Sequence, residues 1–163
     1  MFSRHFEEAR QLFDKKVAIL GIGAIGSILG MTLLQSGIEN LYIVDQDYVD
    51  LENISRSVYI ESNIGIKKTE AFKRCASLKD GDYGHRVIES GSLEEVIQLN
   101  PDLLIVCIGS LYDEYIISHQ IRRSGFDKAV FVFGQNDSTW GGIYFQDDPQ
   151  LMPSRKLLTP LGA

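Results

Sequence analysis

A spaced glycine triplet that follows a short apolar run is the feature that most constrains this chain. Residues 17–20 have β character, residues 21–26 read Gly-Ile-Gly-Ala-Ile-Gly, and residues 27–36 read as an apolar helix. In a strand–turn–helix unit the first glycine permits a tight turn, the second lets the backbone approach a ligand, and the third lets the helix pack closely. The helix N-terminus then offers free N–H groups to an anion. The motif predicts a nucleotide site, and its candidate binding residues are Gly21, Gly23, Ala24 and Gly26.

The rest of the chain alternates between apolar runs of strand length and helical segments. This order predicts a Rossmann-like α/β fold, with a mostly parallel sheet and helices on both faces. We also expect an N-terminal helix, a short extra late strand, and a polar loop with short helical turns over residues 46–65. The expected strands are residues 17–20, 41–44, 86–89, 102–108, 129–133 and 141–145, and the expected helices are residues 2–13, 27–36, 67–78, 93–99 and 112–123.

Composition narrows the class of protein and its partners. The 163 residues carry a net charge of -6, so no nucleic-acid partner is expected. No apolar run approaches ~18 residues and the charged N-terminus lacks a signal core, so we expect no membrane contact and a cytoplasmic location. Cys75 and Cys107 are too few for a disulfide framework, and no cysteine–histidine spacing suggests zinc. We expect a nucleotide-binding domain over residues 1–147 and a tail, or the start of a truncated C-terminal segment, over residues 148–163.

Polar residues after the second expected strand give this nucleotide site its chemistry. Asp45 stands about 20 residues past the glycines, where a carboxylate can accept hydrogen bonds from both ribose hydroxyls. Asn53 and Arg56 are three residues apart, so on a helical turn they share one face and can clamp phosphate oxygens. Lys67 and Lys68 stand at the start of the next expected helix, where an ammonium group suits a phosphate.

Taken together, these motifs resemble the ThiF family. The order Gly-x-Gly-x-x-Gly, Asp-x-Asp-x-Val, Asn-x-x-Arg, Gly-x-x-Lys runs through the segment from about residue 16 to about residue 147. The family includes the adenylyltransferases of molybdopterin and thiamine synthesis and the ubiquitin-activating enzymes. The resemblance implies an ATP-dependent adenylyltransferase that uses ATP and Mg2+ and acts on the C-terminal carboxylate of a small ubiquitin-like protein or peptide. It also implies a homodimer.

The resemblance also implies a role for individual residues. Asp45 would hold the ribose, while Asn53 and Arg56 would bind the β- and γ-phosphates. Lys68 would stabilise charge near the α-phosphate, which makes Arg56 and Lys68 the candidate catalytic residues. Lys67 is the alternate lysine if the register slips by one, and Asp47 is a candidate for orienting the site. An N-terminal arginine donated by a partner subunit would be Arg4 or Arg10.

One departure from the family pattern concerns the metal. Family members usually carry a Mg2+-binding aspartate just after the fourth sheet strand, and residues 106–111 hold no acid. Asp113 follows a few residues later, either as a metal ligand or as an acid that favours a helix N-terminus. No cysteine follows Cys107 to carry a thioester. The missing acid therefore leaves open a non-catalytic nucleotide-binding or dimerising subunit. A nicotinamide-dependent oxidoreductase also stays open, because it would use the glycines and Asp45, although it leaves Asn53, Arg56 and Lys68 without a role.

Overall fold

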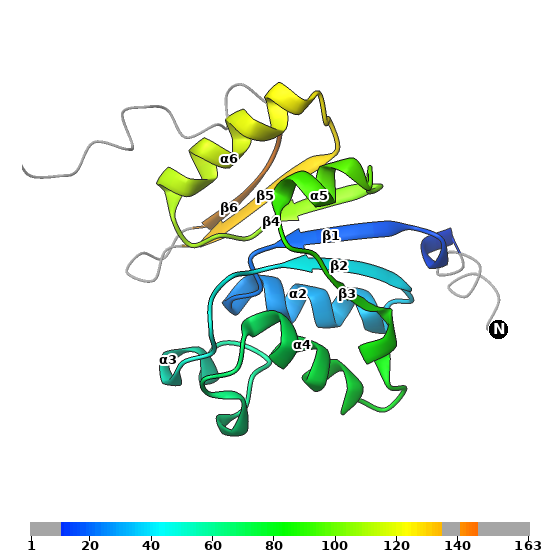
Figure 1. The fold of residues 1–163 in the computed structure, drawn as a ribbon, viewed down its shortest axis with the longest axis vertical. Helices are drawn as coiled ribbons and strands as arrows, with labels where there is room; N and C mark the ends of the chain where they lie inside the picture. Colours follow the sequence, from blue (N-terminus) through cyan, green and yellow to red (C-terminus); the bar gives the residue numbers. More distant parts are fainter. Residues whose placement is uncertain (1–10, 135–140, 147–163) are drawn as a thin grey trace, which may run out of the picture.

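The computed structural model describes residues 11–134 and 141–146, and it shows a six-stranded sheet with helices on both faces (Figure 1). The strand order is β3-β2-β1-β4-β5-β6. Neighbouring strands are parallel except β5 and β6, which are antiparallel. The strands are β1 (Lys16–Leu20), β2 (Asn40–Val44), β3 (Val87–Glu89), β4 (Leu103–Val106), β5 (Ala129–Gly134) and β6 (Gly141–Phe145).

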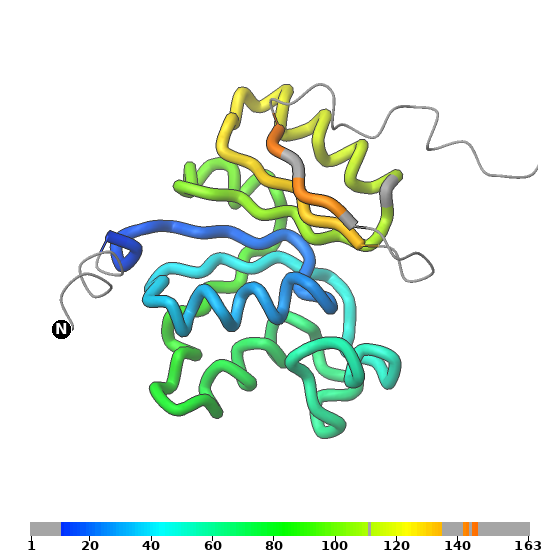
Figure 2. The backbone as a smooth tube through the Cα atoms, turned by 180° about the vertical axis from the view of Figure 1, so that it is seen from behind, coloured from blue at the N-terminus to red at the C-terminus, as the bar shows by residue number. Residues whose placement is uncertain are grey.

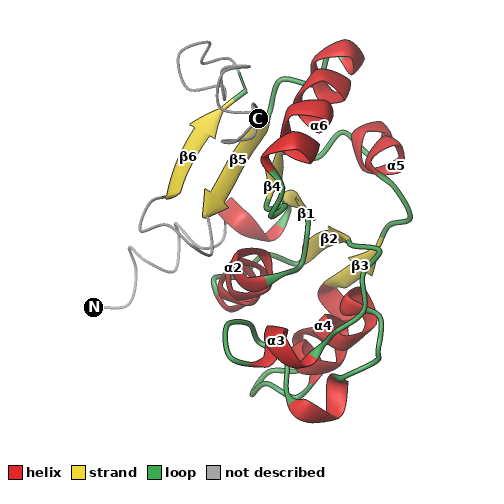
Figure 3. Ribbon diagram, turned by 90° about the vertical axis from the view of Figure 1, so that its left-hand side faces the viewer, coloured by secondary structure: helices red, strands yellow, loops and turns green. Residues whose placement is uncertain are grey.

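Two pairs of helices cover the two faces of the sheet. Figure 3 shows α2 and α4 on one side and α5 and α6 on the other. The described helices are α2 (Ala24–Gln35), α3 (Leu51–Ile54), α4 (Lys68–Ser77), α5 (Leu93–Gln98) and α6 (Leu111–Ser124), with short 3-10 turns η1 (Glu61–Asn63) and η2 (Tyr83–Arg86). Within residues 11–134 and 141–146, none of the helices combines the length and the apolar character that a bilayer crossing requires.

Each layer has its own apolar core, because the central strands are buried on both sides. Ile19 and Ile43 pack with Phe72 on the α2–α4 side, whereas Leu104 and Phe131 pack with the residues under α5 and α6. Strands that are covered on both faces read as continuous apolar runs rather than as alternating patterns. This is why residues 17–20 and 102–108 stand out in the sequence.

The Rossmann-like α/β fold expected from the sequence is confirmed, and several boundaries differ by one to three residues, three of them for a clear structural reason. The helix after the glycine motif begins at Ala24, because the second half of the motif forms its first turn and Ser27 N donates to Gly23 O at 3.0 Å. Strand β4 is shorter than residues 102–108, since the apolar run continues after the chain has left the sheet. Strand β3 begins at Val87, because Arg86 belongs to η2.

Some expected segments lie outside the described residues. Residues 11–13 are helical, in agreement with the expected N-terminal helix, but residues 1–10 are not described. Arg4 and Arg10 belong to that stretch, and the expected tail over residues 148–163 is also outside. The polar loop over residues 46–65 is confirmed, and it contains the short helix α3 and the turn η1.

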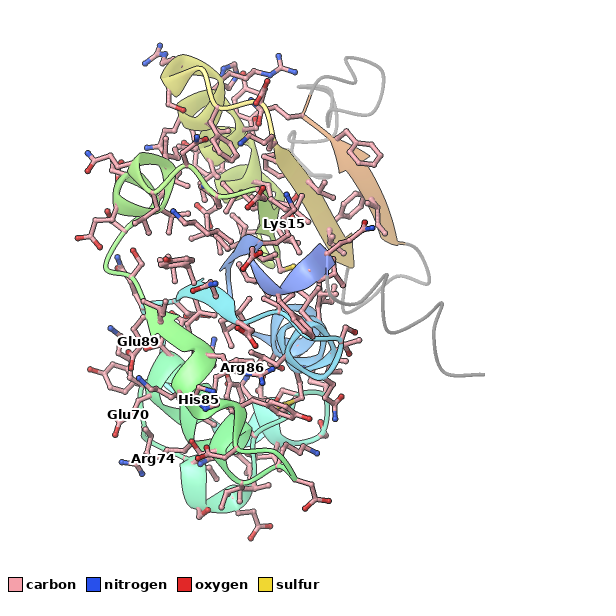
Figure 4. The ribbon with its side chains drawn as sticks, turned by 90° about the vertical axis from the view of Figure 1, so that its right-hand side faces the viewer. Lys15, Glu70, Arg74, His85, Arg86 and Glu89 are labelled. Atoms are coloured by element: carbon pink, nitrogen blue, oxygen red, sulfur yellow. The ribbon has the colours of Figure 1, made fainter. Side chains whose placement is uncertain are left out.

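The flank of the domain that carries α4, η2 and β3 is charged. Figure 4 shows Glu70, Arg74, His85, Arg86 and Glu89 along this flank. Arg74 Nη2 lies 2.5 Å from Glu70 Oε1, and both side chains are about half exposed. Exposed pairs of this kind stabilise a protein by about 0–1 kcal/mol, so Arg74 is a suitable control position for the experiments below.

Candidate functional site

The glycine turn between β1 and α2 is built so that only glycine fits at two of its positions. Gly21 has a φ of 92°, and a Cβ there would lie 2.5 Å from the carbonyl oxygen of Cys107. A Cβ at Gly26 would run into the carbonyl oxygen of Gly21. The first turn of α2 is thereby held tightly against the end of β1 and the segment after β4. Gly26 is buried under the turn and has the packing role expected of a third glycine.

Gly23, in contrast, has room beside it in the described part of the chain. Apart from its chain neighbours, no described atom lies within 4 Å of the position that a Cβ would take, and as the N-cap of α2 it has no side chain to cap the helix. A helix N-terminus presents N–H groups and the positive end of the helix dipole. The head of α2 is therefore arranged to receive an anion.

Asp45 is fixed against this turn from the end of β2. Its Oδ2 accepts a hydrogen bond from Ile22 N at 2.8 Å, and its Oδ1 accepts one from Asp47 N at 2.9 Å. The side chain is half-buried, and each carboxylate oxygen has a further lone pair. The carboxylate is thus held in one orientation and still able to accept hydrogen bonds from a bound hydroxyl group.

Two adjoining cavities open over the carboxyl ends of the strands. The larger has a volume of about 640 Å³ and is lined by Gly21, Asp45 and Asp113 among others. The smaller has a volume of about 240 Å³. Gly23, Ala24, Ile25, Asp47, Asn53, Arg56, Lys68, Cys107, Ile108, Gly109, Val132, Phe133 and Gly134 line the smaller one. Because Gly23, Asp47 and Lys68 line both, the cavities form one continuous crevice.

Lys68 is the lysine that belongs to this crevice. Its side chain is 11% exposed, and its Nζ lies 2.8 Å from Asp47 Oδ2. Lys68 N also donates to Asp47 O at 2.9 Å, which fixes the start of α4. The alternate, Lys67, is exposed and is the N-cap of α4, and it lines neither cavity.

The short helix α3 and the turn that follows it supply the remaining polar residues. Asp50 caps it by accepting from Glu52 N at 2.7 Å, and Asn53 Oδ1 accepts from Asp50 N at 3.2 Å. With that oxygen engaged, the amide NH₂ is the end of Asn53 that can bind an anion. Arg56 N donates to Asn53 O at 3.2 Å, so the backbone turn brings both side chains to the smaller cavity.

Asp113 lies in the first turn of α6, is exposed, and lines the larger cavity. Its backbone N donates to Ser110 Oγ at 3.2 Å, which caps the helix. Among the described residues, no group of three or more histidine, cysteine, aspartate or glutamate side chains is arranged to hold a metal ion. Mg2+ commonly takes one or two carboxylates together with phosphate oxygens and water. Asp113 and Asp47 are two carboxylates on the lining of the larger cavity, and a nucleotide would supply the phosphate oxygens.

Cys107 and Glu114 are buried beside the crevice. Burial, with a smaller contribution from the nearby Glu114 carboxyl, raises the pKa of the Cys107 thiol to about 12. The thiol therefore stays protonated, as expected for an inert cysteine. Burial also raises the pKa of Glu114 to about 8. In the described part of the chain, neither of its carboxyl oxygens has a hydrogen-bond partner.

Several lining residues escaped the sequence analysis. They are Ser92, Leu93 and Glu94 at the head of α5, Ser110, Ile117 and Gln120 at α6, and Val132, Phe133 and Gly134 on β5. The order of the strands in the sheet is what locates these residues, because the carboxyl ends of parallel strands meet at one edge of a sheet. The residues that follow β3 and β4 must therefore face those that follow β1 and β2.

The crevice lies beside the point where the strand order reverses, between β1 and β4. In open parallel sheets this switch point is where ligands bind. Fold and crevice together define a Rossmann-like α/β domain with a glycine-turn anion site.

A family model described as the ThiF family matches residues 3–120. The chain therefore belongs to the ThiF family. Ubiquitin-like modifier-activating enzyme 5 of Drosophila grimshawi is 34% identical over 76 residues, which are 47% of this chain and 19% of that enzyme. The same enzyme of Caenorhabditis briggsae is 37% identical over 68 residues, which are 42% of this chain and 15% of the enzyme. The matched segment is thus about a fifth of these relatives or less.

Solved structures share the fold at lower identity. The E. coli tRNA N6-threonylcarbamoyladenosine dehydratase TcdA has a TM-score of 0.65 and 23% identity, over 76% of this chain and 54% of TcdA. E. coli MccB with AMPCPP and MccA has a TM-score of 0.61 and 19% identity, over 81% of this chain and 44% of MccB.

Proposed function

We propose that this domain binds ATP and adenylates a carboxylate, namely the C-terminal carboxylate of a small ubiquitin-like protein or peptide. The observation that carries this proposal is the convergence of Asp45, Arg56 and Lys68 on one crevice at the head of α2. The relatives support it: one group is named ubiquitin-like modifier-activating enzyme 5, TcdA has been solved with AMP, and MccB has been solved with AMPCPP and MccA.

The two cavities suit the two ends of the nucleotide. In this proposal the nucleoside occupies the larger cavity, where Asp45 accepts hydrogen bonds from the ribose hydroxyls. The phosphates lie across the head of α2 towards the smaller cavity, where Asn53 and Arg56 bind the β- and γ-phosphates. An amide and a guanidinium group together donate several hydrogen bonds to phosphate oxygens.

Lys68 acts on the reacting phosphate. The pairing with Asp47 holds its ammonium group at the junction of the cavities, within reach of an α-phosphate there. A carboxylate oxygen of the substrate attacks the α-phosphorus, the bond to pyrophosphate breaks, and the products are an acyl adenylate and pyrophosphate. The positive charge of Lys68 stabilises the negative charge that develops in this step. Bound Mg2+, held by Asp113 and Asp47, would neutralise phosphate charge.

No side chain has to become covalently attached in this reaction. The step depends on positioning and charge neutralisation, which the fixed orientations of Asp45 and Lys68 supply. Cys107, the cysteine on the lining, keeps its proton because burial raises the pKa of its thiol. We therefore assign the adenylation step alone to these residues.

A homodimer is part of the proposal, and an apolar surface supports it. Viewed from behind, β5 and β6 face the reader beside α2, with no described helix in front of them (Figure 2). Ile143 and Phe145 on β6 are each 64% exposed, and they pair with Val132 and Val130 on the same face. Large exposed apolar patches mark protein–protein contacts.

Sedimentation velocity tests this surface. The dimer should dissociate in Ile143→Glu, because a charge would be buried without a partner. Ile116→Glu on the exposed side of α6 is the matched control and should leave the mass unchanged. A monomeric wild type, or equal masses for all three proteins, would refute the assignment.

ATP–pyrophosphate exchange tests the adenylation itself. The assay uses ATP, labelled pyrophosphate and candidate C-terminal peptides, with Arg56→Ala as the test variant and Arg74→Ala as the control. We expect exchange in the wild type and in Arg74→Ala, and its loss in Arg56→Ala. Tight ATP binding without exchange would favour the non-catalytic subunit, which the absence of an acid from residues 106–111 supports. Binding of NADH without ATP would favour the oxidoreductase.

A further inference from the structure

The hydroxyl group of Tyr59 makes an unusual connection beneath the crevice. The side chain is 2% exposed, and its hydroxyl donates to the carbonyl oxygen of Ile22 at 2.5 Å. The same hydroxyl lies 3.3 Å from the carbonyl oxygen of Lys68. One phenol thus links the middle of the glycine turn with the first residue of α4.

We propose that Tyr59 is a positioning residue that aims the Gly23 N–H at the phosphates of the nucleotide and sets the distance from this amide to Lys68. The inference rests on the proposed function, since it concerns the same crevice. It assigns no contact between Tyr59 and the nucleotide, because the side chain lies underneath the lining.

The geometry of the peptide bond carries the first part of this inference. In a trans peptide, the C=O and N–H groups point in opposite directions. The carbonyl of Ile22 and the N–H of Gly23 belong to one peptide unit, and Ile22 is fully buried while Gly23 lines both cavities. Tyr59 holds the carbonyl inward, so the Gly23 N–H points towards the crevice. A hydrogen bond on the carbonyl also polarises the N–H of the same peptide.

The preceding peptide unit is fixed independently. Ile22 N donates to Asp45 Oδ2 at 2.8 Å, so the turn is held from the end of β2 as well as from Tyr59. With both peptide units held, the turn has little freedom to reorient when a ligand arrives. Such preorganisation raises affinity because the cost of ordering is met before binding.

The backbone around Tyr59 is itself held in place. Tyr59 N donates to Ser57 Oγ at 3.2 Å, and Ser57 Oγ donates to Asn53 O at 2.6 Å. Val58 N donates to Ser27 Oγ at 3.3 Å, which ties the loop to α2. The loop that carries Tyr59 is therefore attached both to α3, which carries the phosphate-binding candidate Asn53, and to α2, which begins directly after Gly23.

The chemistry of the buried phenol suits a permanent donor. Burial is the main cause that raises its pKa, and the charge of Asp45 adds to it, so the hydroxyl keeps its proton at any physiological pH. A phenylalanine would fill the same space but would leave the carbonyl of Ile22 without its partner. The Tyr59→Phe variant therefore isolates the hydrogen bond from the packing.

The experiment compares ATP with adenosine. Isothermal titration of wild type, Tyr59→Phe and Tyr83→Phe is carried out with both ligands, and thermal unfolding shows that each variant is folded. Tyr83 is a half-buried tyrosine of η2 that lines neither cavity, so Tyr83→Phe is a matched control that also removes one hydroxyl group. We expect Tyr59→Phe to weaken ATP about tenfold, as for one lost charge-assisted hydrogen bond, with adenosine and Tyr83→Phe nearly unchanged.

Each other result overturns the inference in a recognisable way. Equal loss of ATP and adenosine affinity would mean that Tyr59 only supports the fold of the pocket. Unchanged ATP affinity in Tyr59→Phe would remove its role while leaving the adenylation proposal intact. If the wild type binds no ATP, both the role of Tyr59 and the adenylation proposal would be refuted. If Tyr59→Phe does not fold, amide NMR of the wild type decides, because ATP should shift the Gly23 N–H strongly and an unmoved signal would refute the orientation.

Discussion

The two halves of the sheet differ in how firmly their polar groups are held. In the half that contains β1, β2 and β3, the site candidates are fixed by backbone hydrogen bonds. The Asp45 carboxylate accepts two of them, the Asn53 side chain accepts one, and Lys68 N donates to the backbone of Asp47 while the ammonium group of Lys68 pairs with the same residue. This half presents its binding groups in set positions.

The half that contains β4, β5 and β6 is different. Gly109 and Ser110 stand on the lining within the acid-free stretch after β4, and Glu114 is buried without a hydrogen-bond partner in the described chain. Ile143 and Phe145 leave an apolar face uncovered by the described helices. In the proposed function, the ribose, the phosphates and the catalytic lysine all belong to the first half, whereas the second half would contribute to the metal and to assembly.

The largest effect is expected at Lys68. Lys68→Ala should lower the rate of ATP–pyrophosphate exchange by about 10²–10³-fold, the range seen when a preorganised group that stabilises transition-state charge is removed. Lys67→Ala is the matched control, because Lys67 is exposed and lines neither cavity. Equal losses in the two variants would show that the first half does not hold its catalytic lysine where the crevice indicates.

Arg56 should discriminate between nucleotides by their phosphates. Arg56→Ala should weaken ATP about ten- to a hundredfold and AMP much less, because AMP lacks the phosphates that Arg56 is proposed to contact. Fluorescence competition with both nucleotides measures the ratio. A variant that loses ATP and AMP equally would move Arg56 out of this role and would weaken the contrast between the halves.

Much of the candidate site in the first half could be predicted from the sequence, because the residues that define it lie close together in the chain. The turn, the helix it opens and the position of Asp45 follow from glycine sterics and strand length over residues 17–45 alone. Asn53 and Arg56 follow from the spacing of one helical turn. These features need no knowledge of distant contacts, and the structure brings all of these side chains to the crevice or its rim.

The strands and helices of the second half were predicted, but its lining residues other than Asp113 and the role of Tyr59 were not, because these arise only in three dimensions. Nothing in residues 57–60 indicates that a tyrosine there reaches the carbonyl of Ile22, which is 37 residues away in the chain. Ser92 and Gln120 join the lining only when the sheet order is known. The buried position of Glu114 also depends on how α6 lies on the sheet, since the sequence of α6 alone places an acid in an ordinary first turn.

Glu114 should make stability depend on pH in the second half. Its pKa is raised from an ordinary value near 4.5 to about 8, so the unfolded chain loses this proton before the folded one does. The stability is fully present below about pH 4.5, falls as the pH rises towards 8, and is level above it. Glu114→Gln cannot titrate, so its free energy of unfolding should fall less over this interval, by at most about 1.4 kcal/mol for each pH unit.

Denaturant unfolding of wild type and Glu114→Gln at pH 5, 6.5 and 8 measures this difference. The change of stability with pH is compared rather than the absolute values, since the glutamine amide also needs hydrogen-bond partners. Parallel curves for the two proteins would mean that Glu114 is solvated or paired in solution, and the two halves would then be alike in this respect.

Asp113 should give the smallest effect, and it tests whether the second half contributes to the metal. The side chain is exposed and its helix is capped by Ser110, so Asp113→Asn should hardly change the melting temperature. If Asp113 helps to hold Mg2+, the variant should need about 3–10 times more Mg2+ for half-maximal ATP binding, an effect of about 1 kcal/mol as expected for one exposed ligand shared with phosphates.

Glu94 is another exposed acid on the same lining, so Glu94→Gln is the control for a general change of charge. An unchanged Mg2+ requirement in Asp113→Asn would leave Asp113 with only its helix N-terminal position, and the metal would then have to depend on Asp47 of the first half.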